Sequence, residues 1–149
     1  MDLRQQFPRS IREILGGYVH FARMIDKGRA ALTNSLGDYI FPCPLDQRLL
    51  DFWGVSSDKF LTVVEGRSES GIQEWIIQNT TSHTPQEIED WNTAQLARGP
   101  DTQEKLDYFH KTRDAIDPTR TDISTWADLL DLDENRHVPL KMASPLSAQ

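Results

Sequence analysis

The side chain best suited to covalent chemistry in this sequence is the thiol of Cys43, the only cysteine among 149 residues. It lies between Pro42 and Pro44 in the stretch YIFPCPLDQRLL. The thiolate is the nucleophilic form of cysteine, and a helix N-terminus or a neighbouring cation favours it. Pro44 suits the first turn of a helix, and Pro42 keeps the preceding backbone extended. These features predict that Cys43 is the N-cap of a helix.

The neighbours of Cys43 argue against a reactive thiol. Asp46 is expected at the third position of the helix, where its carboxylate can reach back to the Cys43 backbone and its charge opposes a thiolate. No histidine lies near Cys43 in the sequence to act as a base, although one could approach in the folded chain. We therefore interpret Cys43 as a small buried residue at a structural junction and as a weak catalytic candidate only.

Four basic side chains follow one arc if residues 11–32 form a single helix. Arg12, His20, Arg23 and Lys27 then share a face at about 100° per residue. A solvated face is the simpler interpretation, because charged arcs are routine on amphipathic helices. The alternative is an anion site, since Arg23 and Lys27 at i and i+4 repel each other unless an anion lies between them.

Two further charges fall on the apolar side of the same helix. Arg29 lies in line with Ile11, and Asp26 is about 60° away, so the two could form a buried ion pair. Either they satisfy each other and nearby backbone groups, or they anchor a pocket next to the 38–46 loop. The candidate ligand-binding residues are Arg23, Asp26, Lys27, Arg29, Tyr39 and Cys43.

No metal or cofactor motif is complete. The four histidines are far apart in the sequence, and none pairs with a cysteine or with another histidine at zinc-ligand spacing. The stretch DLDEN at 131–135 begins like a calcium loop, but Arg136 replaces the required glycine and Met142 replaces the bidentate glutamate. Gly16-Gly17 fits neither a phosphate loop nor a dinucleotide fingerprint. We expect no metal and no cofactor.

The composition is that of a globular protein without a membrane span. Hydrophobic residues make up 38% and charged residues 26%, and no run of 18 apolar residues occurs. The N-terminus lacks the apolar core of a signal peptide, and a single cysteine cannot form an internal disulfide. We expect a cytoplasmic protein.

The charge is distributed unevenly along the chain. Residues 1–31 carry six basic and three acidic side chains, a net charge of +3, which leaves −10 for the remainder of a chain whose total is −7. An acidic protein is a poor general DNA binder, because duplex affinity comes largely from neutralising phosphates with a continuous basic surface. A small basic patch for one anion remains compatible with this balance.

Helix-start signals recur along the whole chain, whereas strand patterns are brief. Capping boxes begin at Ser10 and at Thr84, the second with proline at the first helical position. Further starts are expected at Pro44, Ser57, Ser70, Asp101 or Thr102, and Ser124. We predict an all-α fold of six or seven short helices around a long central first helix, with a single domain over residues 1–135 and a loosely ordered C-terminal tail over 136–149.

Glycines and tryptophans indicate how the helices pack. Gly16, Gly17 and Gly28 each cost about 1 kcal/mol inside a helix relative to alanine, so either another backbone approaches closely or the helix kinks at Gly16-Gly17. The four tryptophans fall in four different predicted helices and are interpreted as core anchors rather than a base-stacking surface.

Several blocks together resemble a known family. FPRS, LGGYVHFARMIDKGRAAL, LGDYIFPCPLDQRLLDFWGV, EWI, ARGP and RTDISTWADLLDLDE occur in the order and at the spacing of the domain of unknown function family 5069, over about residues 3–135. The resemblance implies a self-contained bacterial domain with no assigned activity, and it transfers no catalytic residues. One departure is Ile11, where the family pattern favours proline after the serine.

Three hypotheses about function follow. The first is a non-enzymatic helical binding or regulatory module that takes a small anionic ligand or a protein partner through helix one and the 38–46 loop. The second is an enzyme in which Cys43 is the nucleophile and Arg23 or Lys27 holds an anionic substrate. The third is nucleic-acid binding through the basic arc, which the acidic composition makes the least favoured. The oligomeric state stays open.

Overall fold

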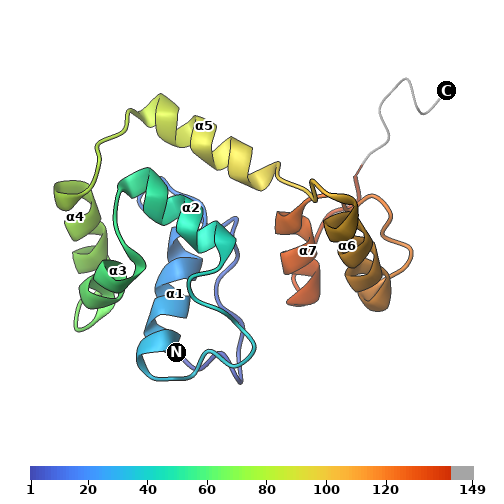
Figure 1. Cartoon of the computed structure of the whole chain (residues 1–149), viewed down its shortest axis with the longest axis horizontal. Coiled ribbons are helices and arrows are strands. Elements are labelled where there is room, and N and C mark those ends of the chain that lie inside the picture. Colours follow the sequence, from blue (N-terminus) through green and yellow to red (C-terminus); the bar gives the residue numbers. More distant parts are fainter. Residues whose placement is uncertain (142–149) are drawn as a thin grey trace. The chain divides into compact units, whose positions relative to one another are not determined.

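A computed structural model describes residues 1–141, and within this range the chain forms seven α-helices and no β-strand (Figure 1). The prediction of an all-α fold is thereby confirmed. The helices are α1 (Phe21–Leu32), α2 (Pro44–Trp53), α3 (Ser57–Val64), α4 (Glu69–Asn79), α5 (Pro85–Leu96), α6 (Gln103–Ile116) and α7 (Trp126–Asp133).

Side-chain caps fix most of the helix starts. The predicted capping box of α5 is present: the Thr84 hydroxyl accepts from the Glu87 N–H at 3.1 Å, and the Glu87 carboxylate accepts from the Thr84 N–H at 2.9 Å. Cys43 caps α2 and Thr102 caps α6, both as predicted. The caps of α3, α4 and α7 lie within two residues of the predicted starts, at Ser56, Ser68 and Thr125.

The prediction of helix over residues 11–20 is wrong. Leu15 and Tyr18 exchange two backbone hydrogen bonds of 3.0 and 2.9 Å around Gly16 and Gly17, whose φ angles are 57° and 88°. Both values lie in the left-handed region, which suits a two-residue reverse turn and not a helix. The apolar spacing of Ile11, Leu15 and Tyr18 imitated a helical face, but the Gly-Gly pair reverses the chain.

The first helix therefore begins only after a left-handed residue. His20 has φ 68° and precedes α1, its N–H donates to the Ile11 carbonyl at 2.8 Å, and its own carbonyl accepts from Met24 at 2.9 Å. A left-handed conformation costs a non-glycine residue about 1–2 kcal/mol, so the surrounding contacts must hold it. The His20 side chain is fully buried.

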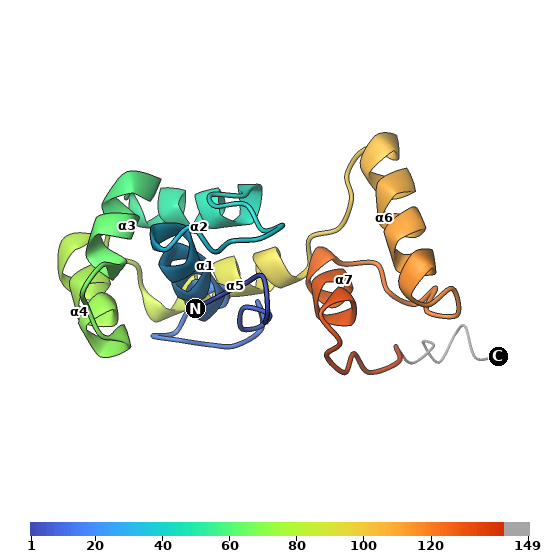
Figure 2. The ribbon, with the colours of Figure 1, turned by 90° about the horizontal axis from the view of Figure 1, so that it is seen from below.

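The described chain divides into two compact units, residues 1–92 and residues 93 onward. In the first unit α3 packs against α1, α2 and α4 (Figures 1 and 2). At Gly28 a side chain approaches closely instead of the predicted backbone, since a Cβ there would lie 3.3 Å from the Phe60 ring. The core consists of Tyr18, Phe21, Met24, Ile25, Leu49, Leu50, Trp53, Phe60, Val63, Val64, Ile72 and Ile76.

The second unit is smaller and is built on α6 packed against α7. Its core consists of Phe109, Ile123, Leu129 and Val138, with Trp126 packed against it. Residues 136–141, assigned to the tail from the sequence, are bonded to this unit: the Lys141 N–H donates to Asp122 at 3.0 Å, and its ammonium lies 2.9 Å from Asp128. The rest of the predicted tail, residues 142–149, lies outside the described residues. The single domain over residues 1–135 stays a prediction.

The four tryptophans occupy four helices, as predicted, and each packs on a core. Trp53, Trp75 and Trp91 pack in the first unit, and Trp126 packs in the second. None of the helices in the described range is long and apolar enough to cross a membrane.

Candidate functional site at the N-terminus of α2

Helix α1 and the 38–46 loop meet at the start of α2. The Lys27 ammonium on α1 lies 3.2 Å from the Cys43 sulfur, and the Arg23 guanidinium lies 5.7 Å from the centre of the Tyr39 ring. Four of the six predicted ligand-binding residues are thus brought together. Lys27 and Arg23 are one helical turn apart on α1, which places both toward the loop.

Asp46 is the centre of this cluster. One carboxylate oxygen lies 2.6 Å from His20 Nε2, and the other accepts from the Lys27 ammonium at 2.6 Å and from the Cys43 N–H at 2.9 Å. Asp46 and His20 are fully buried, and Lys27 is nearly so. Buried ionised groups need a partner of opposite charge, and Asp46 and Lys27 supply that to each other.

The electrostatics of the cluster fix the protonation states. Burial alone would raise the pKa of Asp46, but hydrogen bonds from His20 and the charge of Lys27 outweigh it and hold that pKa well below its usual range. Burial lowers the pKa of His20, so its imidazole is neutral at pH 7. An ionised Asp46 can only accept, so the His20 proton resides on Nε2 and is donated to the carboxylate.

Two polar groups in the cluster retain unused hydrogen-bonding capacity. His20 Nδ1 is buried and has no hydrogen-bond partner within residues 1–141. The Lys27 ammonium has three N–H groups, of which Asp46 and Cys43 take two in the described structure. One donor of a buried cation is therefore left for another acceptor.

Cys43 caps α2 through both its backbone and its side chain. Its sulfur accepts from the Asp46 N–H while the Asp46 carboxylate accepts from the Cys43 N–H, which is the capping box predicted from the sequence. Cys43 is half-buried rather than buried, so the prediction of a buried cysteine is wrong. The sulfur also contacts the Lys27 ammonium at 3.2 Å.

The backbone donors at the start of α2 are almost fully used. Pro44 has no N–H, the Asp46 N–H reaches the Cys43 sulfur, and the Gln47 N–H donates to the Cys43 carbonyl at 3.0 Å. Among the described residues, only the Leu45 N–H of this first turn lacks an acceptor. It is the second unused donor close to Cys43.

The interpretation of the basic arc as a solvated face is wrong. His20, Arg23 and Lys27 are 0%, 3% and 3% exposed, and only Arg12 is exposed. The Gly16-Gly17 turn removes Arg12 and His20 from the helical register on which the arc was drawn, and Arg23 and Lys27 contact the 38–46 loop. Because most of the arc is buried, this face presents no continuous basic surface to nucleic acid, and the structure does not support the hypothesis of nucleic-acid binding through it.

The expected pair between Asp26 and Arg29 is also absent from the described structure. The Asp26 carboxylate is buried and accepts from the Arg9 side chain at 3.1 and 3.2 Å and from the Arg9 N–H at 2.9 Å. Burial opposes ionisation of Arg9, but its bonds to Glu69 and Asp26 outweigh this and raise its pKa. Arg29 lies elsewhere, beside a shallow hollow lined by Leu32, Thr33, Val64 and Arg67 among others.

Sequence reasoning missed two members of the cluster, His20 and Asp46, as site residues. Asp46 was recognised only as a cap. Its position one turn before the buried face of α2 was the signal that it could also contact buried groups. No local signal identified His20, which is 26 positions from Asp46 and was assigned to an exposed arc.

The fold and this cluster define an all-α protein with a buried His-Asp-Lys network at a helix N-terminus. Residues 1–141 contain no group of three or more histidine, cysteine or acidic side chains placed to hold a metal ion. The model of the family named Domain of unknown function (DUF5069) matches residues 5–136, so the chain belongs to that family. No curated protein matches the chain.

Proposed function

We propose that this protein is a small helical binding module that takes one small anion at the N-terminus of α2. The observation that carries the proposal is the Lys27 ammonium, which lies between Asp46 and Cys43 with one N–H unused. The unused Leu45 N–H supports it, because backbone donors at a helix N-terminus and the helix dipole both favour an anion.

The burial of Lys27 points the same way. Its ammonium is nearly fully buried with one N–H unused, and the neighbouring imidazole of His20 is neutral. An unused donor on a cation in a poorly hydrated place favours a single small anion, such as a phosphate, sulfate or carboxylate group. Asp46 orients Lys27 and prevents it from turning toward solvent.

Isothermal titration of the full-length protein with inorganic phosphate, with sulfate and with a panel of small anionic metabolites tests the proposal. We expect saturable binding of at least one of them at a ratio of one to one. Lys27→Met should weaken it about tenfold or more, because a charge-assisted hydrogen bond contributes about 1.5–3 kcal/mol. Arg23→Gln should weaken it about threefold or more through charge alone.

Matched variants separate a direct contact from net charge. Lys27→Met/Asp46→Asn has the net charge of the wild type but lacks the ammonium, so we expect it to lose binding. Lys111→Met removes the same charge from an exposed lysine and should leave binding unchanged. If the double variant binds as well as the wild type, or if the panel yields no saturable ligand, the proposal is wrong. Arg23→Gln carries the test if the Lys27 variants do not fold.

Nucleophilic chemistry by Cys43 is a second candidate function, and the contact with Lys27 is the observation that favours it. An ammonium 3.2 Å from the sulfur would stabilise a thiolate. Against it, the nearby imidazole of His20 is bonded to Asp46 and makes no hydrogen bond with the sulfur in the described structure. The rate of alkylation by iodoacetamide between about pH 5 and pH 10 distinguishes the two, because a reactive thiol titrates well below about 8.5.

A further inference from the structure

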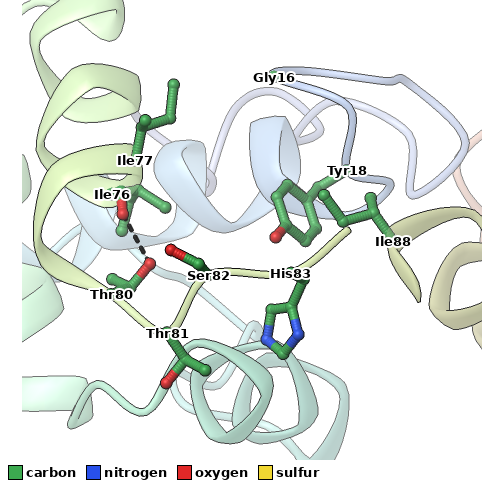
Figure 3. A pocket seen from close by; sticks show the side chains of 9 residues that line it. All are labelled: Gly16, Tyr18, Ile76, Ile77, Thr80, Thr81, Ser82, His83 and Ile88. Carbon is green, nitrogen blue, oxygen red and sulfur yellow. Dashed lines mark hydrogen bonds between the residues drawn. The ribbon is translucent and has the colours of Figure 1, made fainter. Parts of the chain in front are cut away.

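A second hollow, separate from the Cys43 cluster, lies in the first unit between Tyr18 and the segment that joins α4 to α5 (Figure 3). Its volume is about 160 Å³, which is comparable to cavities that bind benzene. It is lined by Gly16, Tyr18, Ile76, Ile77, Thr80, Thr81, Ser82, His83 and Ile88. None of these residues carries a formal charge except His83 when protonated.

Tyr18 is the polar group best placed to meet a ligand in this hollow. It is only 8% exposed, and its ring packs edge-on against Trp53 and Phe21 at centroid distances of 5.4 and 6.5 Å. Figure 3 shows the ring directed toward the Ser82–His83 segment, with its hydroxyl at the near end. The position of the ring is therefore fixed by the aromatic core and not by the hollow.

The Tyr18 hydroxyl has a proton to donate. Burial raises the pKa of Tyr18, so the phenol stays protonated at neutral pH. The indole of Trp53, whose ring packs edge-on against Tyr18, offers this hydroxyl no acceptor, because its Nε1 is buried without a hydrogen-bond partner in the described structure and an indole N–H can only donate. Within the described chain, the phenolic O–H thus has no acceptor, although it is directed into a partly enclosed space.

The polar side chains of Thr80, Thr81 and His83 are directed elsewhere or already bonded, whereas the Ser82 hydroxyl lies on the same side of the segment as Tyr18 in Figure 3. His83 Nε2 bonds to the Phe52 carbonyl at 2.6 Å, and the His83 ring stacks on the Phe52 ring at 3.6 Å. The Thr80 hydroxyl donates to the Ile76 carbonyl at 2.6 Å. In Figure 3 the side chains of Thr81 and His83 point to the opposite side of the segment from Tyr18. The remaining walls near Tyr18 are the apolar side chains of Ile76 and Ile88.

The geometry points to a binding site for a small, neutral, mostly apolar molecule that carries one hydrogen-bond acceptor, such as an aromatic ketone or amide. The isoleucines provide the apolar contacts, and the Tyr18 O–H donates to the acceptor and orients it. A charged ligand is disfavoured, because no side chain of opposite charge lines the hollow. This site is independent of anion binding at α2, so either can fail without the other.

The test is a ¹H–¹⁵N NMR titration of the full-length protein with acetophenone, with ethylbenzene and with benzoate. Acetophenone has the acceptor, ethylbenzene lacks it, and benzoate adds a charge. We expect saturable shifts from acetophenone at Tyr18, Ile76 and Ile88, and weaker binding of benzoate. Tyr18→Phe should weaken acetophenone about three- to tenfold and leave ethylbenzene unchanged, since one hydrogen bond contributes about 0.5–1.5 kcal/mol.

Controls make each outcome decisive. Tyr108→Phe removes a hydroxyl from a tyrosine that is 63% exposed in the second unit and should change nothing. Ile77→Lys places a charge on a lining residue that is 74% exposed, so it should fold and should weaken acetophenone. The inference is overturned if acetophenone gives no saturable shift at these residues, if benzoate binds more tightly than acetophenone, or if Tyr18→Phe weakens both neutral ligands equally.

Discussion

Replacing Asp46 by asparagine is the most informative perturbation of the buried network. The carboxylate accepts hydrogen bonds from His20, Lys27 and the Cys43 backbone, and it is fully buried. Asparagine has nearly the same shape but no charge, and its amide group directs two donors toward groups that are themselves donors. Lys27 would become a buried cation without a counter-ion, which costs about 3–5 kcal/mol in comparable cases.

A double-mutant cycle isolates the Asp46–Lys27 contribution. Asp46→Asn and Lys27→Met should each destabilise the protein, and the double variant should cost about 1–3 kcal/mol less than the sum, because removing both charges removes the mismatch. Asp51→Asn, on the exposed face of the same helix, is the control and should cost less than about 0.5 kcal/mol.

Urea unfolding followed by tryptophan fluorescence provides the free energies of unfolding. A Trp126→Phe background restricts the signal to the tryptophans of the first unit, where the network lies. The reasoning is refuted if Asp46→Asn costs less than about 1 kcal/mol, or if the two single effects add within about 0.5 kcal/mol.

Three further predictions concern pH and backbone conformation. Burial lowers the pKa of His20 in the folded protein, so the unfolded chain binds a proton at a higher pH than the folded protein does. The free energy of unfolding should therefore decrease as the pH is lowered through about 6.5, by up to about 1.4 kcal/mol per pH unit. Urea midpoints between about pH 5 and 8 measure this fall, which should be shallower in His20→Gln. Because the pKa of Asp46 is lowered, Asp46 should add a second loss of stability below the ordinary aspartate pKa of 3.8. Gly17→Ala should destabilise by about 1–2 kcal/mol, because φ is 88°, and an unchanged urea midpoint would contradict the turn. Gly99→Ala should destabilise the second unit by about 1–3 kcal/mol, since a Cβ there would lie 2.5 Å from the Ser124 carbonyl, and Trp126 fluorescence would report it.

Features set by neighbouring residues could be predicted from the sequence. The capping box of Cys43 and Asp46 and that of Thr84 and Glu87 depend on contacts three positions apart, and both are present. The all-α class and the starts of α2 to α7 follow from the same local chemistry, whereas no helix begins at the capping box predicted for Ser10. The resemblance to the family was also correct, since its model covers nearly the whole described chain.

Features that depend on the reversal at Gly16-Gly17 could not be predicted by projecting residues 11–32 onto one helix. The turn removes the first ten residues from that projection, and it places Arg9 rather than Arg29 beside Asp26. It also directs His20 inward to Asp46. These partners are 17 and 26 positions apart, so only the fold brings them together.

The most direct test of the account is the backbone amide of Leu45 during a ¹H–¹⁵N NMR titration with inorganic phosphate. The proposed anion accepts from this N–H and from Lys27, so the Leu45 resonance should shift saturably, together with that of Asp46, in the wild type and in Lys111→Met. It should not shift in Lys27→Met/Asp46→Asn, which has the same net charge as the wild type. A Leu45 resonance that does not respond to phosphate in the wild type, or that responds equally in the double variant, would contradict the account.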